Sequence, residues 1–347
     1  MRQIIIDLGT LEILGRQIPL RIFGYGLMLV LGFLLAVWFA RWRARRAGED
    51  PEAMTKCGLL ALVAGVLGAR FAYVIENWRD FRDAGPLTVL NITSGGLIYY
   101  GGLIGAALAV VAYMAIRRLP MRRYIDILAI SLMLGLAFGR AGCLLNGCCW
   151  GARSDADWAF SMRFPIYSKP LVKLDGRPEN PYSLTTSGPT PVYAWQLSRG
   201  LVAPPAELID EKGQLKRPAL LSEREVALAE ATWSLPVKPA QPLGIVNALL
   251  LAGVLSVFYR MRRREGQVFA LMLILYPVTR FLLESIRADN DHNILELILT
   301  HNQVTSLLMF LAGIGLLVLI RRFPASAGPV LAERLAAAGG RRRATAS

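Results

Sequence analysis

The sequence predicts an all-α polytopic membrane protein with seven transmembrane helices and a small outer-face head domain. The mean hydropathy is +0.42, and 54% of the 347 residues are hydrophobic while 18% are charged. This composition is too apolar for an ordinary soluble protein of that length. Apolar runs near the ~20 residues that cross a bilayer as a helix recur along the chain. The basic residues cluster between alternate runs.

The predicted transmembrane helices occupy residues 22–40, 57–78, 96–116, 124–142, 242–259, 267–285 and 303–320. We interpret the first as a retained helix, because it begins deep in the chain and lacks a small-residue cleavage site after it. Two of the helices carry charges at membrane depth: Arg70 and Glu76 in the second, Arg280 and Glu284 in the sixth. Such charges are costly in a bilayer and indicate a functional site or a buried ion pair.

The basic residues predict the orientation of the helices. They lie in the connections between helices one and two, three and four, and five and six, and after helix seven, and include Arg41, Arg43, Arg45, Arg46, Lys56, Arg117, Arg118, Arg122, Arg123, Arg260, Arg262, Arg263, Arg264, Arg321 and Arg322. Positive loops stay in the cytoplasm. The N-terminus is therefore expected outside and the C-terminus inside. Much of the formal net charge of +14 is explained without a nucleic-acid partner.

Four regions follow from this topology. Residues 1–142 hold helices one to four, 143–241 form an outer-face loop or head domain, 242–322 hold helices five to seven, and 323–347 form a disordered cytoplasmic tail. The head region is polar and rich in proline. It contains one short helical stretch, "SEREVALAEATW", in which Ser222 precedes two acidic residues as an N-cap does.

Glycine pairs open the third predicted helix in "SGGLIYYGGLIGA" at 94–106. Gly101 and Gly102 fit close packing between helices, since small residues let two backbones approach in a membrane. Tyr99 and Tyr100 would lie near the outer interface, where a phenol anchors among headgroups or donates to a polar substrate.

The sixth predicted helix carries a polar stripe in "YPVTRFLLESIR". Tyr276, Arg280, Glu284 and Arg287 are spaced by four, four and three residues, so that one helix face displays them together. Two explanations stay open: a structural Arg280–Glu284 pair that joins helices, or an anion site with a carboxylate beside it.

The stretch "GRAGCLLNGCCWG" at 139–151 adds Arg140 at the outer end of the fourth helix. Arginine suits bidentate contacts with phosphate. Because Arg140 and Arg280 belong to different helices at outer-leaflet depth, we expect a phospholipid headgroup as ligand. Tyr25 and Gly26 in the first helix are further candidates near that interface.

The cysteines of the same stretch do not predict a metal site. Cys143, Cys148 and Cys149 lack paired CxxC spacing, and the chain has only two histidines. No metal and no cofactor are therefore expected. A disulfide between Cys143 and one of the adjacent pair stays open in an oxidising outer compartment.

Together with "FGYGLMLVLGF", these three motifs resemble the bacterial prolipoprotein diacylglyceryl transferase family, in order along the chain and over roughly residues 20–151 and 236–320. The resemblance implies transfer of the diacylglyceryl group of phosphatidylglycerol to the lipobox cysteine thiol of a prolipoprotein, with release of glycerol phosphate. It also implies a multi-pass protein of the bacterial inner membrane, with phosphatidylglycerol, membrane lipids and the prolipoprotein signal peptide as partners. The candidate catalytic residues are Arg140, Arg280, Glu284 and Tyr100, and the candidate substrate-binding residues are Arg140, Tyr25, Tyr276, Arg287, Gly151, Gly101 and Gly102. Of these, the resemblance implies functional roles for Arg140, Arg280, Glu284, Tyr276, Tyr25 and Gly151.

The chain departs from the family pattern in three places. Tyr100 stands where many members have a histidine that is proposed as the base. A free tyrosine, with a pKa of about 10, needs flanking arginines to act as a base at neutral pH. Glu284 or an arginine-polarised water are alternative bases. Lys238 replaces another histidine in "VKPAQPLG", and Cys143 and Cys148 occupy the usual asparagine and glutamate positions of the arginine motif.

Two other classes of function stay open. One is a divergent paralogue that moves a lipid moiety to a different acceptor. The other is a non-catalytic membrane protein in which Arg140, Arg280 and Glu284 only recognise an anionic headgroup.

Overall fold

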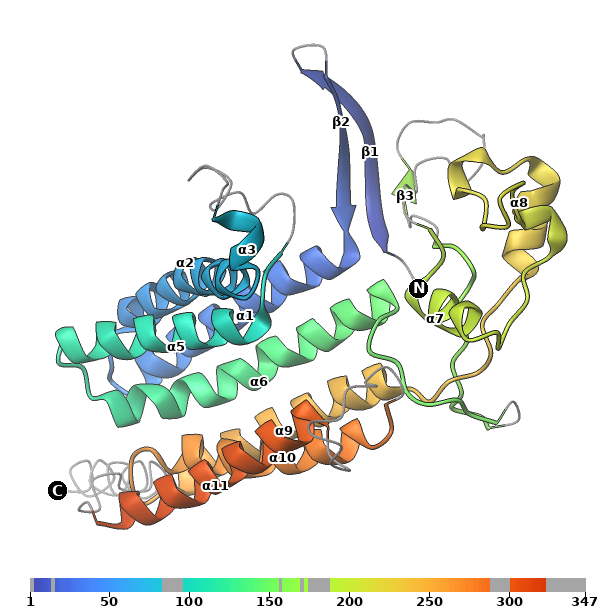
Figure 1. The fold of residues 1–347 in the computed structure, drawn as a ribbon. Coiled ribbons are helices and arrows are strands. Elements are labelled where there is room, and N and C mark those ends of the chain that lie inside the picture. The colour runs from blue at the N-terminus through green and yellow to red at the C-terminus, as the bar shows by residue number, and fades with distance from the viewer. Residues whose placement is uncertain are drawn as a thin grey trace, which may run out of the picture. The chain divides into compact units, whose positions relative to one another are not determined.

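The computed structural model describes residues 3–13, 16–82, 96–155, 158–168, 172–173, 188–287 and 300–322. Within these ranges, seven helices are long and apolar enough to cross a membrane, which confirms the predicted class and number (Figure 1). They are α1 (Gly24–Arg46), α2 (Pro51–Glu76), α5 (Tyr99–Ile116), α6 (Met121–Asn146), α9 (Ala240–Met261), α10 (Gln267–Glu284) and α11 (His301–Arg321).

Several helices extend past the apolar runs that predicted them. The last turn of α1 carries three arginines, which are favourable at a helix C-terminus because its carbonyl groups leave a partial negative charge there. Helix α2 begins at Pro51, and the Asp50 side chain accepts a 2.8 Å hydrogen bond from the Glu52 N–H as the N-cap. Helix ends are set by such caps, whereas hydropathy marks only the apolar interior.

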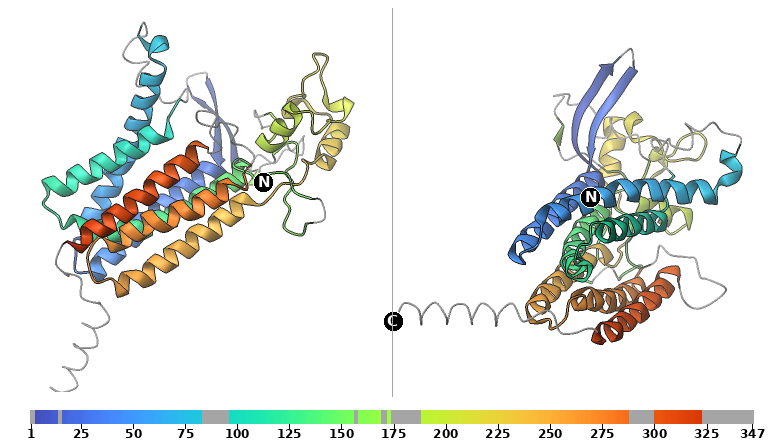
Figure 2. Two further views of the ribbon diagram at one scale, coloured as in Figure 1. Left: turned by 60° about the horizontal axis from the view of Figure 1, so that its bottom comes forward. Right: turned by 90° about the vertical axis from the view of Figure 1, so that its left-hand side faces the viewer.

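Two N-terminal strands lie outside the all-α prediction. Strands β1 (Ile4–Ile13) and β2 (Arg16–Phe23) pair antiparallel as a hairpin, visible in both views of Figure 2. The short β3 (Val172–Lys173) adds to β1 in parallel. The run of isoleucines at residues 4–6 is the sequence signal for this hairpin, because β-branched residues favour strands.

The remaining elements are short. They are α3 (Trp78–Phe81), α7 (Pro191–Ser198), η1 (Ala206–Leu208), η2 (Pro218–Leu220) and α8 (Glu223–Ala231). Helix α8 is the short helix expected in the head region. Its N-cap, Ser222, and Glu225 form a reciprocal capping box, in which each side chain accepts from the other's backbone N–H.

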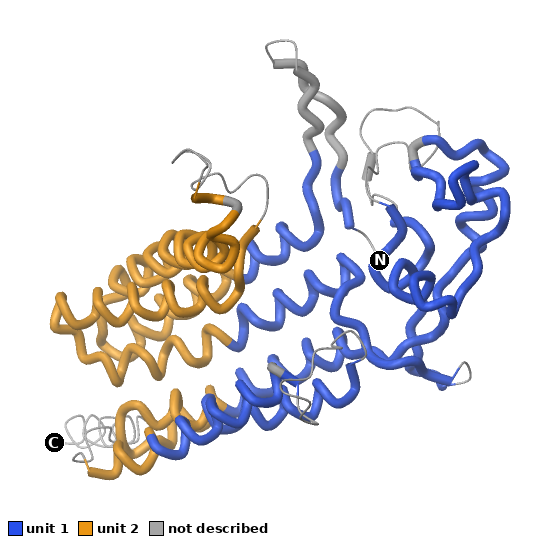
Figure 3. Tube along the Cα trace, viewed as in Figure 1, with its two compact units in different colours: residues 1–32, 133–254, 272–315 blue, residues 33–132, 255–271, 316–347 orange. Residues whose placement is uncertain are grey.

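The chain forms two compact units, shown in Figure 3. Unit 1 comprises residues 1–32, 133–254 and 272–315, and unit 2 comprises 33–132, 255–271 and 316–347. In unit 1, the described head residues build their own core around Tyr167, Tyr193 and Leu208, each at most 1% exposed. The buried Tyr167 hydroxyl donates to the Lys216 carbonyl at 2.8 Å.

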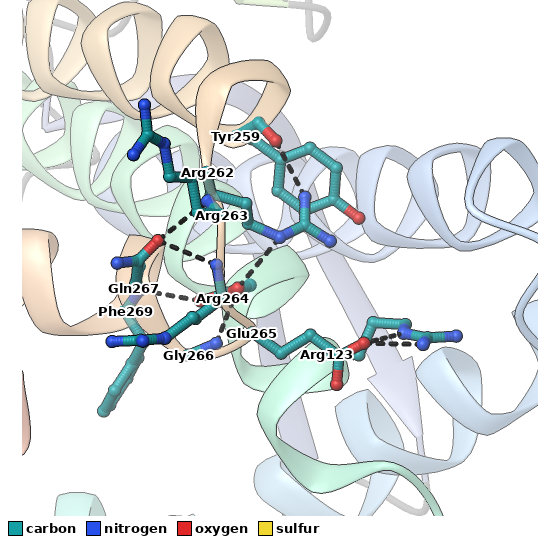
Figure 4. A network of polar contacts seen from close by, with 10 residues as sticks. Arg123, Tyr259, Arg262, Arg263, Arg264, Glu265, Gly266, Gln267 and Phe269 are labelled. Atoms are coloured by element: carbon teal, nitrogen blue, oxygen red, sulfur yellow. Dashed lines mark hydrogen bonds and ion pairs between the residues drawn. The ribbon is translucent and has the colours of Figure 1, made fainter. Parts of the chain in front are cut away.

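Unit 2 holds all four basic clusters and a buried polar network near the α9–α10 turn (Figure 4). The fully buried carboxylate of Asp126 on α6 accepts hydrogen bonds from the N–H groups of Gly266 (2.8 Å) and Phe269 (3.0 Å). It also pairs with Arg262 at 3.3 Å. Asp126 thereby satisfies backbone donors at the start of α10, which would otherwise be buried without partners.

Candidate active site

The polar stripe predicted on α10 is present in unit 1, and it forms an ion-pair cluster. Arg280 Nη1 lies 2.5 Å from Glu284 Oε2, and Arg287 Nη1 lies 3.7 Å from the same oxygen. The other carboxylate oxygen, Glu284 Oε1, accepts a 2.8 Å hydrogen bond from the Asn302 amide on α11. The Glu284 side chain is 1% exposed. Both carboxylate oxygens are thus occupied, and the carboxylate holds two arginines in place.

Arg140 comes to this cluster from the last turns of α6. It interacts electrostatically with Arg280, as do Tyr276 and Arg287. The half-buried Arg140 differs from the other two arginines because, within the described part of the chain, its guanidinium makes no hydrogen bond or ion pair. A partly desolvated cation without an anion is costly, so this arginine is suited to an anionic ligand.

The lack of a side chain at Gly244 leaves space for the Arg140 side chain. A Cβ at Gly244 on α9 would lie 3.2 Å from Arg140 Cδ and 3.4 Å from its Nε. The arginine side chain therefore runs along the bare backbone of α9. Two residues after Arg140 on α6, a Cβ at Gly142 would lie 3.0 Å from the Tyr25 ring. Tyr25 of α1 therefore packs against α6 at this point.

Tyr276 lies one turn before Arg280, and its backbone carbonyl accepts from the Thr279 hydroxyl at 2.9 Å. The same hydroxyl accepts from the Asn247 amide at 3.0 Å. These two hydrogen bonds join α9 to α10 at the residue before Arg280.

Gly151 is a junction of three chain segments. Its N–H donates to the Lys238 carbonyl at 3.1 Å, and it pairs with Arg287 in an antiparallel bridge. The next residue, Ala152, donates to the Ile286 carbonyl at 2.6 Å. A Cβ at Gly151 would meet Lys238 Cβ and its carbonyl oxygen at 2.6 Å, so only glycine allows this approach. The bridge ties the end of the stripe, Arg287, to the chain that follows α6.

The cysteines after Arg140 are free thiols, with no disulfide among the four cysteines, all of which are described. The sulfur atoms of Cys143, Cys148 and Cys149 all lie within 4.8 Å of one another. The pKa of the Cys149 thiol is lowered by hydrogen bonds from Cys143 and Cys148, and further by the charges of Arg287 and Arg140. The thiol group therefore adjoins the arginine cluster.

Three predicted site residues, Tyr100, Gly101 and Gly102, belong to unit 2. A Cβ at Gly101 would lie 2.5 Å from the Gly68 carbonyl oxygen, and one at Gly102 would lie 3.0 Å from the Gly65 carbonyl oxygen. This is the close packing of α2 on α5 that glycines permit in membranes. The Tyr100 side chain is 43% exposed, and its ring lies edge-on to that of Tyr99.

Arg70, the other charge at membrane depth in unit 2, is 5% exposed. It donates to the Gly96 carbonyl at 3.3 Å and lies over the rings of Tyr73 and Phe81. Glu76 is exposed at the end of α2. Arg70 thus contributes to the packing between the α2 helix and the segment before α5.

Two residues of the site were not predicted from the sequence: Asn302, which binds Glu284, and Gly244, which lies along Arg140. The available signals were weak, a polar residue next to a predicted helix and a glycine in "PAQPLG". Gln241, which the resemblance gives as a retained position of the same segment, is fully buried and donates from its amide to the Cys148 carbonyl at 3.0 Å.

The fold and the site define a class: a multi-pass membrane protein with an arginine cluster for an anionic ligand. Arg280 and Arg287 share the Glu284 carboxylate, and Arg140 adds a third positive charge that acts on Arg280. Among these four described side chains, the positive charges exceed the negative ones by two. That balance suits a phosphate ester that gains negative charge as its bond breaks.

Comparison with known proteins names the family. The model of the family "Prolipoprotein diacylglyceryl transferase" matches residues 13–319. The chain therefore belongs to the prolipoprotein diacylglyceryl transferase family, as its motifs predicted.

Two relatives named phosphatidylglycerol–prolipoprotein diacylglyceryl transferase match over most of both chains. The one from Burkholderia ambifaria is 32% identical over 89% of this chain and 94% of its own. The one from Symbiobacterium thermophilum is 28% identical over 89% of this chain and 92% of its own. A third, from Rhodopirellula baltica, is 33% identical over 48% of this chain, and the match spans 36% of that longer protein.

Proposed function

We propose that the protein transfers the diacylglyceryl group of phosphatidylglycerol to the thiol of a prolipoprotein cysteine and releases glycerol phosphate. Family membership makes the chain a transferase of lipoprotein biosynthesis. The single observation that carries the chemistry is Arg140, a partly buried arginine without an anionic partner among the described residues, beside an Arg280 that Glu284 holds in place.

In this mechanism the phosphate diester of the lipid binds between Arg140 and Arg280. The acceptor thiolate attacks the lipid glycerol carbon next to the phosphate, a C–S bond forms, and the C–O bond breaks with its electron pair going to the phosphate oxygen. The leaving glycerol phosphate gains one negative charge in that step. Arginines already in place stabilise this charge without reorganising, which is the most effective form of electrostatic catalysis.

Glu284 supports this reaction as a positioning residue. Its two oxygens are taken by Arg280, Arg287 and Asn302, so accepting a proton would weaken the contacts that orient the arginines. Tyr100 remains the proposed proton acceptor for the thiol, and the glycine packing of α5 on α2 supports the start of the helix that carries it. Tyr25, Tyr276 and Gly151 would bind or shape the substrate site around the arginines.

The proposed partners and location follow from the reaction. The seven apolar helices make this a multi-pass membrane protein. We propose the bacterial inner membrane as its site and place the arginine cluster at the outer leaflet, where the signal peptide of an exported precursor presents its cysteine. The four basic clusters, all in unit 2, support the cytoplasmic assignment of that end of the helices.

The test is reconstitution of the purified protein in vesicles of phosphatidylglycerol with a synthetic lipobox peptide. Mass spectrometry should find the peptide heavier by one diacylglyceryl group, and glycerol phosphate should appear in equal amount. Peptide in which serine replaces the cysteine should give neither product. Glycerol phosphate that appears only with another acceptor would point to a paralogue with a different acceptor, and binding without product would point to headgroup recognition alone.

A further inference from the structure

The end of α6 folds back in a way that gathers three thiols. Gly147 adopts a left-handed φ of 72°, and both its N–H and that of Cys148 donate to the Cys143 carbonyl, at 2.9 and 3.1 Å. This is a glycine-terminated helix end, in which the chain reverses over the last turn. The reversal places Cys148 and Cys149 back over Cys143, with all three sulfur atoms within 4.8 Å of one another.

Contacts with other segments also fix the turn that carries Cys148 and Cys149. The buried Gln241 amide donates to the Cys148 carbonyl, and Cys149 has a φ of 61°, which is uncommon for a residue with a side chain. The neighbouring Trp150 is 5% exposed, and Gly151 is hydrogen-bonded to Lys238. The positions of the three thiols are therefore set by contacts on both sides of the turn.

Three converging thiols suit a metal ion better than a disulfide. A disulfide joins two sulfurs and leaves the third unused. A tetrahedral zinc ion, with Zn–S bonds of about 2.3 Å, places its sulfur ligands about 3.8 Å apart, which is compatible with the observed limit. The charges are favourable too: three thiolates and one divalent cation carry one negative charge, and Arg287 and Arg140 act electrostatically on Cys149.

We propose that Cys143, Cys148 and Cys149 bind a thiophilic divalent cation such as Zn²⁺, and that the fourth coordination position takes the acceptor thiol. Among the described residues this group offers three ligands, so one position of a tetrahedral ion stays open, as in zinc sites that act on a substrate. The proposal departs from the sequence prediction of no metal, which relied on the absence of paired CxxC spacing. Binding of the acceptor thiol at the fourth position rests on the proposed transferase function.

Transfer of the diacylglyceryl group to the acceptor thiol needs no oxidant or reductant. The acceptor thiol binds the ion as a thiolate and its proton passes to water. The sulfur then attacks the lipid glycerol carbon, the C–S bond forms, and the C–O electron pair leaves with glycerol phosphate. The neutral thioether is a weaker ligand than the thiolate and dissociates. Arg140, three residues before Cys143 on α6, would hold the phosphate on the same helix face.

Metal coordination would also deprotonate the acceptor thiol without the histidine that position 100 lacks. A free thiol with a pKa of about 8.5 is only about 3% thiolate at pH 7. A thiol that coordinates a zinc-type ion is deprotonated outright. The gain in thiolate is about 30-fold at pH 7, and a strong protein base is then unnecessary.

The first experiment measures the ion itself. Wild-type protein in detergent, incubated with Zn²⁺ and then dialysed, should retain about one ion per chain, and Co²⁺ in its place should give thiolate-to-cobalt absorption. Cys148→Ala and Cys149→Ala should lose both signals. Cys57→Ala is the matched control, because Cys57 is buried in α2 of unit 2. Wild type that retains no ion, or a disulfide between two of the three cysteines in non-reducing peptide mapping, would overturn the metal site.

The second experiment measures the role of the ion and needs no variant. Removing the ion from wild-type protein with a chelator should lower the transfer rate at pH 7 about 30-fold, and adding Zn²⁺ back should restore it. An undiminished rate after complete removal would overturn activation of the acceptor while leaving the transferase intact. Protein that binds Zn²⁺ but never transfers lipid would overturn the proposed function together with the role of the ion in it, and would leave the metal site standing.

Discussion

Arg280 Nη1 lies 2.5 Å from Glu284 Oε2, one helical turn along α10, and the carboxylate between them is almost fully buried. The same oxygen faces Arg287, and the other binds Asn302 of α11. The two explanations that the sequence left open, a structural ion pair and an anion site, are therefore not exclusive. The pair orients Arg280, and Arg140 beside it, which has no ion-pair partner among the residues that the structure describes, supplies the charge that a ligand can use.

Glu284→Gln should lower both stability and activity. The amide keeps the size of the side chain but removes the charge that pairs with two arginines. Breaking a buried pair leaves an uncompensated charge and costs about 3–5 kcal/mol. Thermal unfolding in detergent should show the loss of stability. The control is Glu52→Gln, which breaks an exposed pair with Arg41 at 2.7 Å and should cost at most about 1 kcal/mol. Equal effects of the two variants would contradict the orienting role of Glu284.

Arg140→Gln should behave differently from Glu284→Gln. Because Arg140 has no described ion-pair partner, its removal should leave the unfolding temperature unchanged or raise it. The transfer rate, in contrast, should fall about 100- to 1,000-fold, the usual cost of losing one charge-stabilising donor.

Arg140→Lys refines that prediction. Lysine keeps the charge but not the two-pronged donor geometry, so it should restore only part of the rate. Normal activity of both substitutions would contradict phosphate binding by Arg140. A large fall in stability would show instead that the arginine is structural.

Gly151→Ala should disrupt the junction at the end of the stripe. The added Cβ would meet Lys238 Cβ and its carbonyl oxygen at 2.6 Å, so the bridge to Arg287 must shift. We expect about a tenfold or greater loss of transfer rate, since small displacements of positioning groups are costly. Gly139→Ala is the control, because nothing lies within 4 Å of a Cβ there. If both alanine variants were fully active, the close approach at Gly151 would have no functional importance.

Asp126→Asn should destabilise unit 2 without a direct effect on chemistry. The carboxylate accepts from two backbone N–H groups and pairs with Arg262, and an amide can replace only part of these contacts. The expected loss is about 2–3 kcal/mol, typical of a buried hydrogen bond to a charged group. Chemical unfolding in detergent measures it, with the exposed Asp155→Asn as control. A loss of transfer rate at unchanged stability would assign Asp126 a different role.

The helices could be predicted because hydropathy depends on local sequence alone. All seven were found, and their ends differed where caps such as Asp50, or basic last turns, extend a helix beyond its apolar run. The β1–β2 hairpin was missed because its strands lie almost wholly before the first apolar run, and only runs of that length guided the prediction.

The candidate site was predicted in part. The stripe from Tyr276 to Arg287 follows from helical spacing alone. Contacts between distant segments do not, so Asn302 and Gly244 were missed. The cysteines show the same limit of spacing rules: a glycine-terminated helix end gathers thiols that no CxxC pattern would indicate.

In the proposed function, Arg140 binds the phosphate of a lipid whose diacylglyceryl group the protein transfers. This role can be measured as glycerol phosphate release from phosphatidylglycerol vesicles by purified wild type and Arg140→Gln, with a lipobox peptide as acceptor. Wild type should release glycerol phosphate in equal amount to thioether-linked peptide, and Arg140→Gln should release it at least about 100-fold more slowly. Equal rates for the two proteins, or no transfer by folded, metal-loaded wild type, would contradict it.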